Sequence, residues 1–513
     1  MKISALVAAQ ALSVANKSTI DTTSGRLVGI ESNGVRAFTG IRYAQAPVNE
    51  LRWEPPVPFA SNQTFNVSTP GPACLQQFAA FSANITIPVF NNPPPPSGED
   101  EDCLFLNVWA PTGGRQEKPV VIFIHGGAFA FGSATLNEYN GESIAGNQDI
   151  IMVSLNYRLN IFGFPSAPDL ALQKSNLGFL DQELAIHWVQ QNIQYFGGDK
   201  RKVTLMGQSA GSVSVSTAYA RHTEWNPPFR AAIMMSAEDT STLPTPDFDA
   251  FNSFANSSGC MQAPGASRLD CLKKVPAATI HNYTNGPLSG SFNPVVDNFT
   301  LYDDLLNRIR TKNTARVPVL IGSTQDDGTI FVYGAKNLTA ALPVVFGSNA
   351  PSAETIHSLY PGLNDSQALA AGYRDNSFRC PSELWSAALV SSGIEHVYRY
   401  SYGAVFADNQ PLPGLGAWHT SELPELFGTF NASTATWAEK VLSHTFQSSF
   451  ANFIKHPKKS PAQNWPEYGQ NGTVANLAYN GNVDLDNVVQ TVSHSTLDSA
   501  CDAFWDKLRD FRP

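Results

Sequence analysis

Short runs of apolar residues recur along the chain, and residues typical of turns follow each run. The runs are rich in β-branched or bulky side chains and lack the polar–apolar alternation of a strand with one face in water. Continuous runs of this kind are typical of strands buried on both faces of a parallel sheet. The pattern therefore predicts buried strands at residues 120–124, 150–155, 203–206, 231–235 and 317–321.

Helical segments lie between the predicted strands, and the clearest covers residues 179–193. Leu180, Leu184 and Trp188 recur there at four-residue steps, which places them on one face of a helix. The glycines that follow, Gly197 and Gly198, end the helix. Strands that alternate with helices predict an α/β fold with a mostly parallel central sheet and helices on both faces. In such folds the chemistry collects at the carboxyl ends of the strands.

The composition indicates one large globular domain. The chain has 513 residues, of which 42% are hydrophobic and 15% are charged. No long linker, charge block or internal repeat divides it, and the proline-rich stretch at residues 91–97 is short, so we expect one domain over residues 16–513. The formal net charge of -10 argues against nucleic acid or an anionic membrane as a partner, because both require clustered lysine and arginine.

The N-terminus predicts export. Lys2, a short apolar run and the small residues that end at Ala15 have the form of a signal peptide over residues 1–15. The run is too short to span a bilayer, and the C-terminus has neither an apolar tail nor a retention signal, so we expect no stable membrane anchor. A high density of Asn-x-Ser/Thr sequons suits a secreted glycoprotein, at Asn62, Asn66, Asn84, Asn256, Asn282, Asn298, Asn337, Asn364, Asn431 and Asn471.

The cysteine content agrees with an oxidising compartment. The even set of 6 would pair there, although spacing alone does not select one connectivity. No Cys-x-x-Cys motif occurs, which argues against a zinc or redox site.

A nucleophile motif follows the predicted strand at residues 203–206. Residues 207–211 read GQSAG, which has the form G-x-S-x-G, and a helix-compatible run follows at residues 210–220. So sharp a turn strains the backbone of the serine, and small residues on either side prevent collisions with neighbouring strands. The bare pattern also occurs by chance in turns, but its strand–turn–helix context indicates Ser209 as a nucleophile.

A second motif follows the predicted strand at residues 120–124, where residues 125–129 read HGGAF. The backbone N–H groups of Gly127 and Ala128, together with that of Ala210, can converge on one oxygen and form an oxyanion hole. A glycine-rich turn without a ligand is the alternative, and the presence of Ser209 makes it the weaker one.

A base and an acid are expected downstream of the serine, in the order serine, acid, histidine. His419 stands out among the histidines because a Gly/Pro-rich loop connects it to a strand-like run at residues 397–401, and function concentrates on such loops. The predicted strand at residues 317–321 runs into a turn that contains Asp326 and Asp327. Either carboxylate can accept a hydrogen bond from His419 Nδ1, and the pattern alone does not separate them; a turn or helix cap is the alternative role.

With these parts in place, the sequence resembles the type-B carboxylesterase/lipase family, which includes cholinesterases and fungal extracellular lipases. The resemblance covers nearly all of the chain after the predicted signal peptide. It rests on FTGIRYA at 38–44 and Pro47, EDCLFLNV at 101–108, NLGFLDQ at 176–182, FGGD at 196–199 and GQSAG at 207–211. The resemblance implies the α/β-hydrolase fold and a carboxylic ester hydrolase that requires no metal and no organic cofactor.

The resemblance also implies catalytic roles. Ser209 is the nucleophile, His419 is the base, and Gly127, Ala128 and Ala210 supply the oxyanion hole. The acid of the family directly precedes a glycine, which selects Asp327 over Asp326, although the family usually has glutamate at that position.

Further roles follow from the same resemblance. Ser236 corresponds to a residue that supports the acid, with Ala237 in place of the family's glycine. The family's cysteine pairing is Cys74–Cys103, Cys260–Cys271 and Cys380–Cys501. The first pair would close a loop over the entrance of the active site, where Phe90 lies.

The implied reaction is acyl transfer from a small-molecule ester to water through an acyl-enzyme. No tryptophan lies between Cys74 and Cys103, and Gln208 rather than glutamate flanks Ser209, so the sequence disfavours choline esters.

Phe129 and Phe131 are expected to shape an apolar acyl pocket, with ordinary core packing as the alternative. Three other functions stay open: an interfacial lipase acting on long-chain acylglycerols, a biosynthetic acyl transferase or cyclase, and a non-catalytic adhesion protein. The last is disfavoured because the serine, an acid and the histidine are all present.

Overall fold

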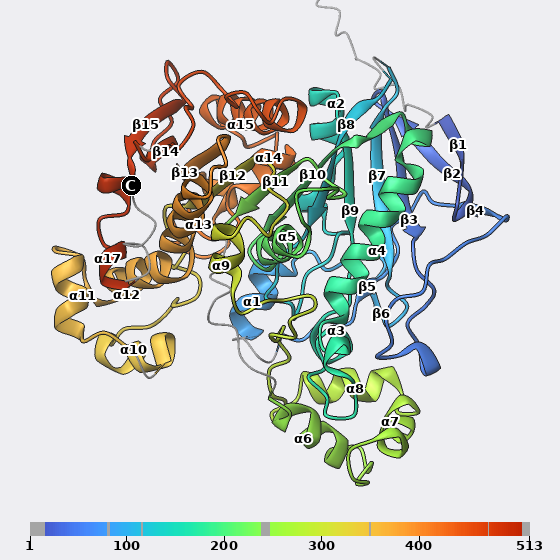
Figure 1. Cartoon of the computed structure of the whole chain (residues 1–513). Helices are drawn as coiled ribbons and strands as arrows, with labels where there is room; N and C mark the ends of the chain where they lie inside the picture. Colours follow the sequence, from blue (N-terminus) through green and yellow to red (C-terminus); the bar gives the residue numbers. More distant parts are fainter. Residues whose placement is uncertain are drawn as a thin grey trace, which may run out of the picture.

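A large, mostly parallel sheet forms the centre of the molecule in the computed structural model (Figure 1). The structure describes residues 16–78, 83–113, 116–236, 247–347, 350–469 and 471–504; the predicted signal peptide at residues 1–15 and Ala237 lie outside them. The described strands of this sheet follow the order β1-β2-β3-β7-β9-β8-β10-β11-β12-β13-β14-β15, and β4 pairs with β2. The strands are β1 (Asn16–Thr22), β2 (Gly25–Ser32), β3 (Val35–Arg42), β4 (Thr64–Asn66), β7 (Phe105–Pro111), β8 (Lys118–Ile124), β9 (Ile151–Leu155), β10 (Gly198–Gln208), β11 (Ala231–Met235), β12 (Val319–Thr324), β13 (Val397–Ala404), β14 (Thr473–Gly481) and β15 (Val489–Ser493), with β5 (Ala73–Cys74) and β6 (Glu99–Asp100) forming a separate pair.

Helices cover both faces of this sheet. The α-helices are α1 (Ala83–Phe90), α2 (Glu142–Gln148), α3 (Asn160–Gly163), α4 (Leu177–Asn192), α5 (Ala210–Arg221), α6 (Asp249–Ser257), α7 (Ala266–Lys273), α8 (Ala277–Thr284), α9 (Leu305–Arg310), α10 (Leu338–Phe346), α11 (Ala353–Leu359), α12 (Asp365–Arg374), α13 (Cys380–Ser391), α14 (Leu423–Phe427), α15 (Trp437–Lys455), α16 (His494–Leu497) and α17 (Cys501–Phe504). Shorter 3₁₀ turns are η1 (Asn49–Leu51), η2 (Asn137–Tyr139), η3 (Leu172–Lys174), η4 (Ile193–Phe196) and η7 (Ala407–Asn409), and η6 (Asp375–Arg379) is a π-helical turn.

The predicted strands are all present, as β8 to β12. The pairs from β9 through β8, β10, β11, β12 and β13 to β14 are parallel. The pairs at both margins are antiparallel, apart from the parallel pair of β2 and β4. The carboxyl ends of parallel strands share one edge of a sheet. This edge therefore receives the segments that follow β8, β10 and β12. These segments contain the predicted oxyanion turn (residues 127–129), Ser209 and Asp327.

Strand β8 shows why the predicted runs are continuously apolar. Val120, Ile122 and Ile124 pack in one buried cluster with residues of α4 and α5. Val121 and Phe123 point to the opposite face and pack with residues of α2, α14 and α15. Side chains alternate across a strand, so a strand covered on both faces needs an apolar residue at every position.

The three residues that the sequence places on one face of α4 differ in burial. Trp188 is buried, but Leu180 and Leu184 are only half-buried. Ala185 and Val189 are fully buried in their place. Leu180 lies instead at the margin of a separate cluster formed with α6 to α8, because α4 has neighbours on more than one side and size alone does not mark the face that meets the sheet.

Three disulfides tie the peripheral segments, in the pairing that the family resemblance implied. Cys74–Cys103 closes the loop that carries α1, Cys260–Cys271 lies in the α6–α8 region, and Cys380–Cys501 joins α13 to α17.

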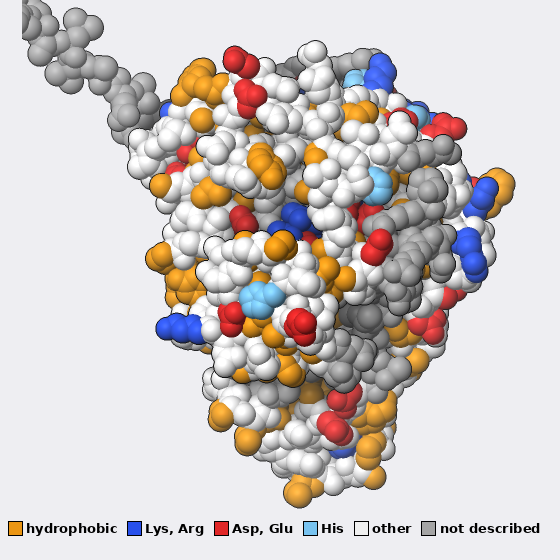
Figure 2. All heavy atoms as spheres, turned by 90° about the vertical axis from the view of Figure 1, so that its left-hand side faces the viewer, with side chains coloured by type: hydrophobic (Ala, Val, Ile, Leu, Met, Phe, Trp, Pro, Cys, Tyr) orange, Lys and Arg blue, Asp and Glu red, His pale blue; other side chains and the backbone are white. Residues whose placement is uncertain are grey.

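The surface seen in Figure 2 carries scattered charges. Among the described residues on that face, acidic and basic side chains alternate with uncharged ones and do not gather into a basic patch. Within the described part of the chain, no helix combines the length and hydropathy that a bilayer crossing requires.

Candidate active site

Ser209 sits on a strained turn between β10 and α5. Its backbone has φ 56° and ψ -125°, a conformation that costs a non-glycine residue about 1–3 kcal/mol. A Cβ atom at Gly207 would lie 2.1 Å from the carbonyl oxygen of Gly211, and one at Gly211 would lie 1.9 Å from that of Ile124. The two glycines thus let β10, β8 and α5 approach closely enough to hold the serine in this conformation.

Asp327 and His419 are in direct contact behind the turn. Asp327 Oδ1 lies 2.7 Å from His419 Nδ1, and both residues are buried. The Ser236 hydroxyl lies 3.1 Å and 2.9 Å from the two carboxylate oxygens, and the Thr324 backbone N–H donates to Oδ2 at 2.9 Å. These donors orient the carboxylate, so an aspartate reaches the histidine despite being one methylene shorter than the glutamate usual in the family.

Asp326 has a different environment. Its Oδ2 accepts a hydrogen bond of 2.9 Å from the N–H of Ala417, and its own N–H donates to the carbonyl of Ala417 at 2.9 Å. Asp326 therefore fixes the backbone of the loop that carries His419, whereas Asp327 contacts the imidazole itself. The geometry separates two carboxylates that the sequence pattern left equivalent.

The imidazole of His419 lies against two aromatic rings and near a buried acid. The ring centres of Phe331 and Phe378 are 5.0 Å and 4.8 Å from that of His419. Glu422 is fully buried, and in the described part of the chain neither of its carboxyl oxygens has a hydrogen-bond partner. Burial, and then repulsion from Asp327, raise the pKa of Glu422 well above its usual range.

The segment after β8 forms a left-handed turn beside Ser209. Gly127, Ala128 and Phe129 have φ values of 105°, 53° and 58°. Within the described residues, the N–H groups of Gly127, Ala128 and Ala210 donate no hydrogen bond, and Gly127 and Ala128 line the same cavity as Ser209. The turn thus carries free donors at the site where a developing oxyanion would need them.

His125 anchors this turn and carries no charge. Its Nδ1 lies 2.8 Å from the carbonyl oxygen of Gly126, and its ring stacks on Tyr157 with centres 4.6 Å apart. Burial lowers the pKa of His125 to about 4, so the ring is neutral near the oxyanion turn.

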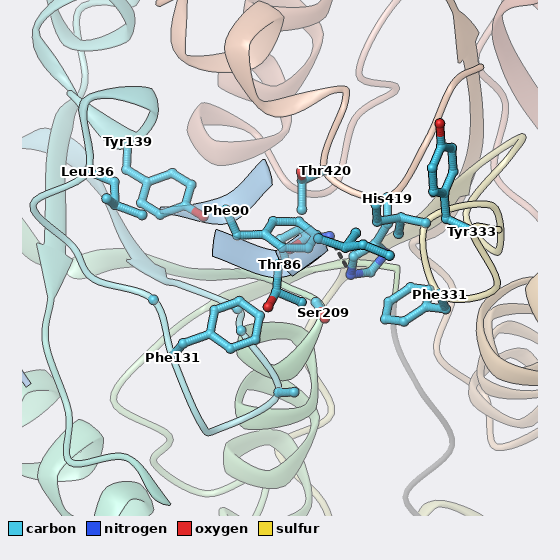
Figure 3. Close-up of a pocket in the computed structure, with 17 residues that line it drawn as sticks. Thr86, Phe90, Phe131, Leu136, Tyr139, Ser209, Phe331, Tyr333, His419 and Thr420 are labelled. Carbon is cyan, nitrogen blue, oxygen red and sulfur yellow. Dashed lines mark hydrogen bonds between the residues drawn. The ribbon is translucent and has the colours of Figure 1, made fainter. Parts of the chain in front are cut away.

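A cavity of about 300 Å³ opens above Ser209 and His419 (Figure 3). One wall comes from α1 in the loop closed by Cys74–Cys103, and the segment that follows Asp327 packs beside α1 in the same wall. No aspartate, glutamate, lysine or arginine is among the described residues that line it. Its apolar and aromatic walls consist of Ile85, Phe90, Phe131, Leu136, Tyr139, Ile330, Phe331 and Tyr333.

The two phenylalanines expected in the acyl pocket have different locations. Phe131 lines the cavity and packs against Phe90, with ring centres 5.6 Å apart. The expectation for Phe129 is wrong, because its side chain turns into the core and meets Phe164 and Phe179 edge to face. The left-handed turn at 127–129 reverses the chain, so residues two apart do not point the same way.

Sequence reasoning missed several residues of the site. Ile330, Phe331 and Tyr333 follow Asp327 by three to six positions, a spacing that could have indicated a wall beside the acid. Phe378 contacts His419 from the π-helical turn η6, and no local sequence pattern predicts that contact.

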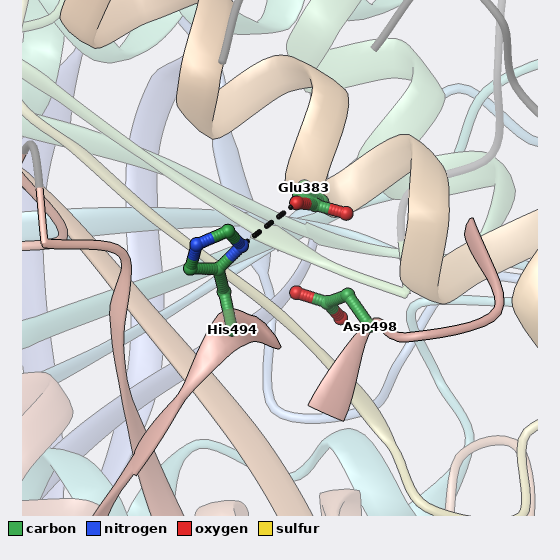
Figure 4. Close-up of side chains that lie close together, drawn as sticks. All are labelled: Glu383, His494 and Asp498. Carbon is green, nitrogen blue, oxygen red and sulfur yellow. Dashed lines mark hydrogen bonds and ion pairs between the residues drawn. The ribbon is translucent and has the colours of Figure 1, made fainter. Parts of the chain in front are cut away.

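A second cluster of titratable groups, Glu383, His494 and Asp498, lies away from this cavity (Figure 4). His494 Nδ1 lies 3.0 Å from a Glu383 carboxyl oxygen. Both oxygens of Asp498 accept hydrogen bonds from the guanidinium of Arg399, which neutralises that carboxylate. His494 and Asp498 are therefore tied to α13 and β13 by a hydrogen bond to Glu383 and an ion pair with Arg399.

Comparison with known proteins identifies the family. The sequence model of the carboxylesterase family matches residues 16–349. The chain belongs to the carboxylesterase family. Para-nitrobenzyl esterase of Bacillus subtilis is 31% identical over 470 residues, which covers 88% of this carboxylesterase and 92% of the relative. Secreted lipase 1 of Botryotinia fuckeliana is 31% identical over 526 residues, covering 90% and 88%.

The solved structures agree with this assignment. The crystal structure of Aspergillus niger EstA matches with a TM-score of 0.79 and 28% identity, and covers 97% of this chain and 99% of the other. The carboxylesterase has the α/β-hydrolase fold and is a carboxylic ester hydrolase.

Proposed function

We propose that this carboxylesterase hydrolyses uncharged carboxylic esters, with Ser209 as nucleophile, His419 as general base and Asp327 as the acid that orients it. One observation carries the proposal: Ser209, His419 and the oxyanion turn with its unbonded N–H groups line a single apolar cavity. The Asp327 contact to Nδ1 leaves the lone pair of a neutral imidazole on Nε2, which faces that cavity and can take up a proton.

The reaction proceeds by two acyl transfers. His419 Nε2 accepts the Ser209 proton as Oγ attacks the ester carbonyl, and the N–H groups of Gly127, Ala128 and Ala210 bind the oxyanion. The proton then passes to the departing alkoxide. Water enters, gives its proton to His419, and releases the carboxylic acid from Ser209 by the same steps. Because His419 must be neutral to begin each step, the rate rises as the pH increases from acidic to neutral values.

The cavity favours apolar, uncharged substrates. No charged side chain among its described lining residues can pair with a cationic alcohol or an anionic acyl group, and Gln208 brings no charge to the serine. A volume of about 300 Å³ accommodates small or medium-sized esters. Long-chain acylglycerols are the second candidate, because the relatives include a protein named secreted lipase 1.

The location and the extent of the domain belong to the same proposal. Residues 1–15 act as a signal peptide, and residues 16–513 form one secreted catalytic domain. Two observations support this: the asparagines of all the sequons are exposed, and the six cysteines are paired in disulfides.

A panel of chromogenic esters tests the proposal. Acyl and alcohol groups are varied in size and charge, and Ser209→Ala serves as the control. Turnover of soluble uncharged esters that disappears in the variant supports esterase function. A sharp rate increase only above the solubility limit of a triacylglycerol would favour the lipase, and no turnover of any ester would contradict the proposal.

A further inference from the structure

Gln208 lies between the oxyanion turn and the histidine. Its side chain is 1% exposed and lines the cavity. Its Nε2 lies 3.3 Å from His419 Nε2, an interaction marked by the dashed line at His419 in Figure 3. Its Oε1 packs against Gly126, where a Cβ atom would approach it to 2.9 Å. The amide therefore contacts the base and lies beside Gly126, the residue before the turn that would bind the oxyanion.

The proton on His419 decides which way this amide points. Asp327 accepts from Nδ1, so the neutral imidazole has a lone pair on Nε2. The carbonyl oxygen of an amide would repel that lone pair, whereas the amide nitrogen can donate to it. The lone pair is also the one that must accept the Ser209 proton, yet in the described part of the chain no hydrogen bond joins the Ser209 hydroxyl to His419. In the resting enzyme, Gln208 rather than Ser209 is thus the hydrogen-bond partner of His419 Nε2.

We propose that Gln208 is a positioning residue that holds His419 neutral in the resting enzyme and releases its Nε2 to Ser209 when an ester binds. This inference rests on the proposed function. The proton moves from Ser209 Oγ to His419 Nε2 as the Oγ–carbon bond forms, and then to the alkoxide as the ester bond breaks. Gln208 gains and loses no proton; its amide N–H leaves Nε2 so that the Ser209 hydroxyl can donate there.

The groups around His419 determine how strongly a charge at position 208 would affect its protonation. Asp327 is the ionised group that touches His419. Glu422 lies near Asp327, and burial raises its pKa well above the usual range, which favours the uncharged carboxyl. His125 on the oxyanion turn is neutral, Tyr139 across the cavity has a pKa raised well above its usual range by burial, and the packed rings of Phe331 and Phe378 carry no charge. A carboxylate at position 208 would add a second negative charge beside His419.

The pH dependence of kcat/KM on a soluble short-chain ester tests this role. In Gln208→Glu the carboxylate favours the protonated imidazole, so the acid limb should move upward by about 1–3 pH units. Gln208→Met removes the donor without adding a charge and should move the limb in the same direction by less. Gln148→Glu is the matched control: Gln148 is buried on α2, where it bonds to Ser448, and the new charge there should leave the limb unchanged.

The outcomes separate this inference from the proposed function. If Gln208→Glu folds and loses rate equally at every pH, Gln208 only fills space and the positioning role is wrong. If Gln208→Glu does not fold, as judged by its thermal melt, Gln208→Met decides, and an acid limb that coincides with the wild type overturns the role. A wild-type protein without any esterase activity would instead refute the proposed function itself.

Discussion

The two sides of the cavity at Ser209 and His419 are held in place by different means. On one side, Ser209, Asp327 and the oxyanion turn follow directly from strands of the parallel sheet, and their positions depend on close backbone packing at Gly207 and Gly211. On the other side, α1 and the segment at residues 330–333 contribute apolar side chains from a disulfide loop and a turn. The first side requires a few particular residues; the second requires only apolar volume. Substitutions on the first side should therefore affect rate, and those on the second should affect substrate preference.

The largest difference is expected between the neighbouring carboxylates. Asp327→Ala removes the partner of His419 Nδ1 and should lower kcat by on the order of 10⁴-fold, because the tautomer and the imidazolium lose their support. Asp326→Ala loses only a backbone contact to Ala417 and should lower kcat by less than about tenfold. Steady-state kinetics on one soluble ester measures both. Equal losses in the two variants would show that the assignment of the acid is wrong.

The oxyanion turn should respond strongly to a single methyl group. In Gly127→Ala the new Cβ would lie 2.1 Å from the carbonyl oxygen of Phe131, at a residue with φ 105°. The turn must shift, and kcat should fall by roughly 100- to 1000-fold. Gly113→Ala is the control, because its Cβ would meet nothing within 4 Å. A Gly127→Ala enzyme that keeps the wild-type kcat would contradict the placement of the oxyanion hole.

The apolar wall should show a smaller and selective effect. Phe90→Ala enlarges the cavity, so kcat/KM for an ester with a bulky apolar group should fall by on the order of tenfold while that for an acetate ester changes little. Ile87→Ala lies on the same helix but outside the cavity lining, and should change neither value. Parallel losses on both esters in Phe90→Ala would indicate that α1 supports the catalytic groups as well as the wall.

The smallest expected effect concerns the stability of the folded protein and depends on Glu425, a buried residue of α14. Burial raises the pKa of Glu425 to about 8, so the folded state retains a proton that the unfolded state releases near its ordinary value of about 4.3. This stabilising contribution is complete below the unfolded value and is lost as the pH rises through the folded one. The melting temperature should therefore fall from pH 5 to pH 8, and less steeply in Glu425→Gln. Parallel melting curves for the two proteins would place the titration elsewhere.

The difference between the two sides of the cavity also explains which parts of the structure could be predicted from the sequence. The strands and the strand–turn–helix around Ser209 were predictable because burial on both faces and a close approach at Gly207 and Gly211 leave few residue choices. The apolar wall of the cavity was not predictable, because nothing in the local sequence distinguishes Leu136 and Phe331 from other apolar residues. Only the folded chain brings them to one cavity.

Side-chain directions were harder to predict than the elements themselves. Leu180, Leu184 and Trp188 share one face of α4, but packing on several sides of that helix buries Trp188, Ala185 and Val189 and leaves the two leucines half-buried. Phe129 is two positions from Phe131, yet the left-handed turn sends it into the core. In both cases the direction of a side chain depended on tertiary contacts, which local spacing does not encode.

Covalent labelling tests the central assignment most directly. The intact protein is treated with a fluorophosphonate, and the modified residue is located by peptide mass spectrometry. A single adduct on Ser209, absent from Ser209→Ala and formed far more slowly in His419→Ala, is the predicted result. An adduct on another residue, or ester hydrolysis that persists in Ser209→Ala, would contradict it.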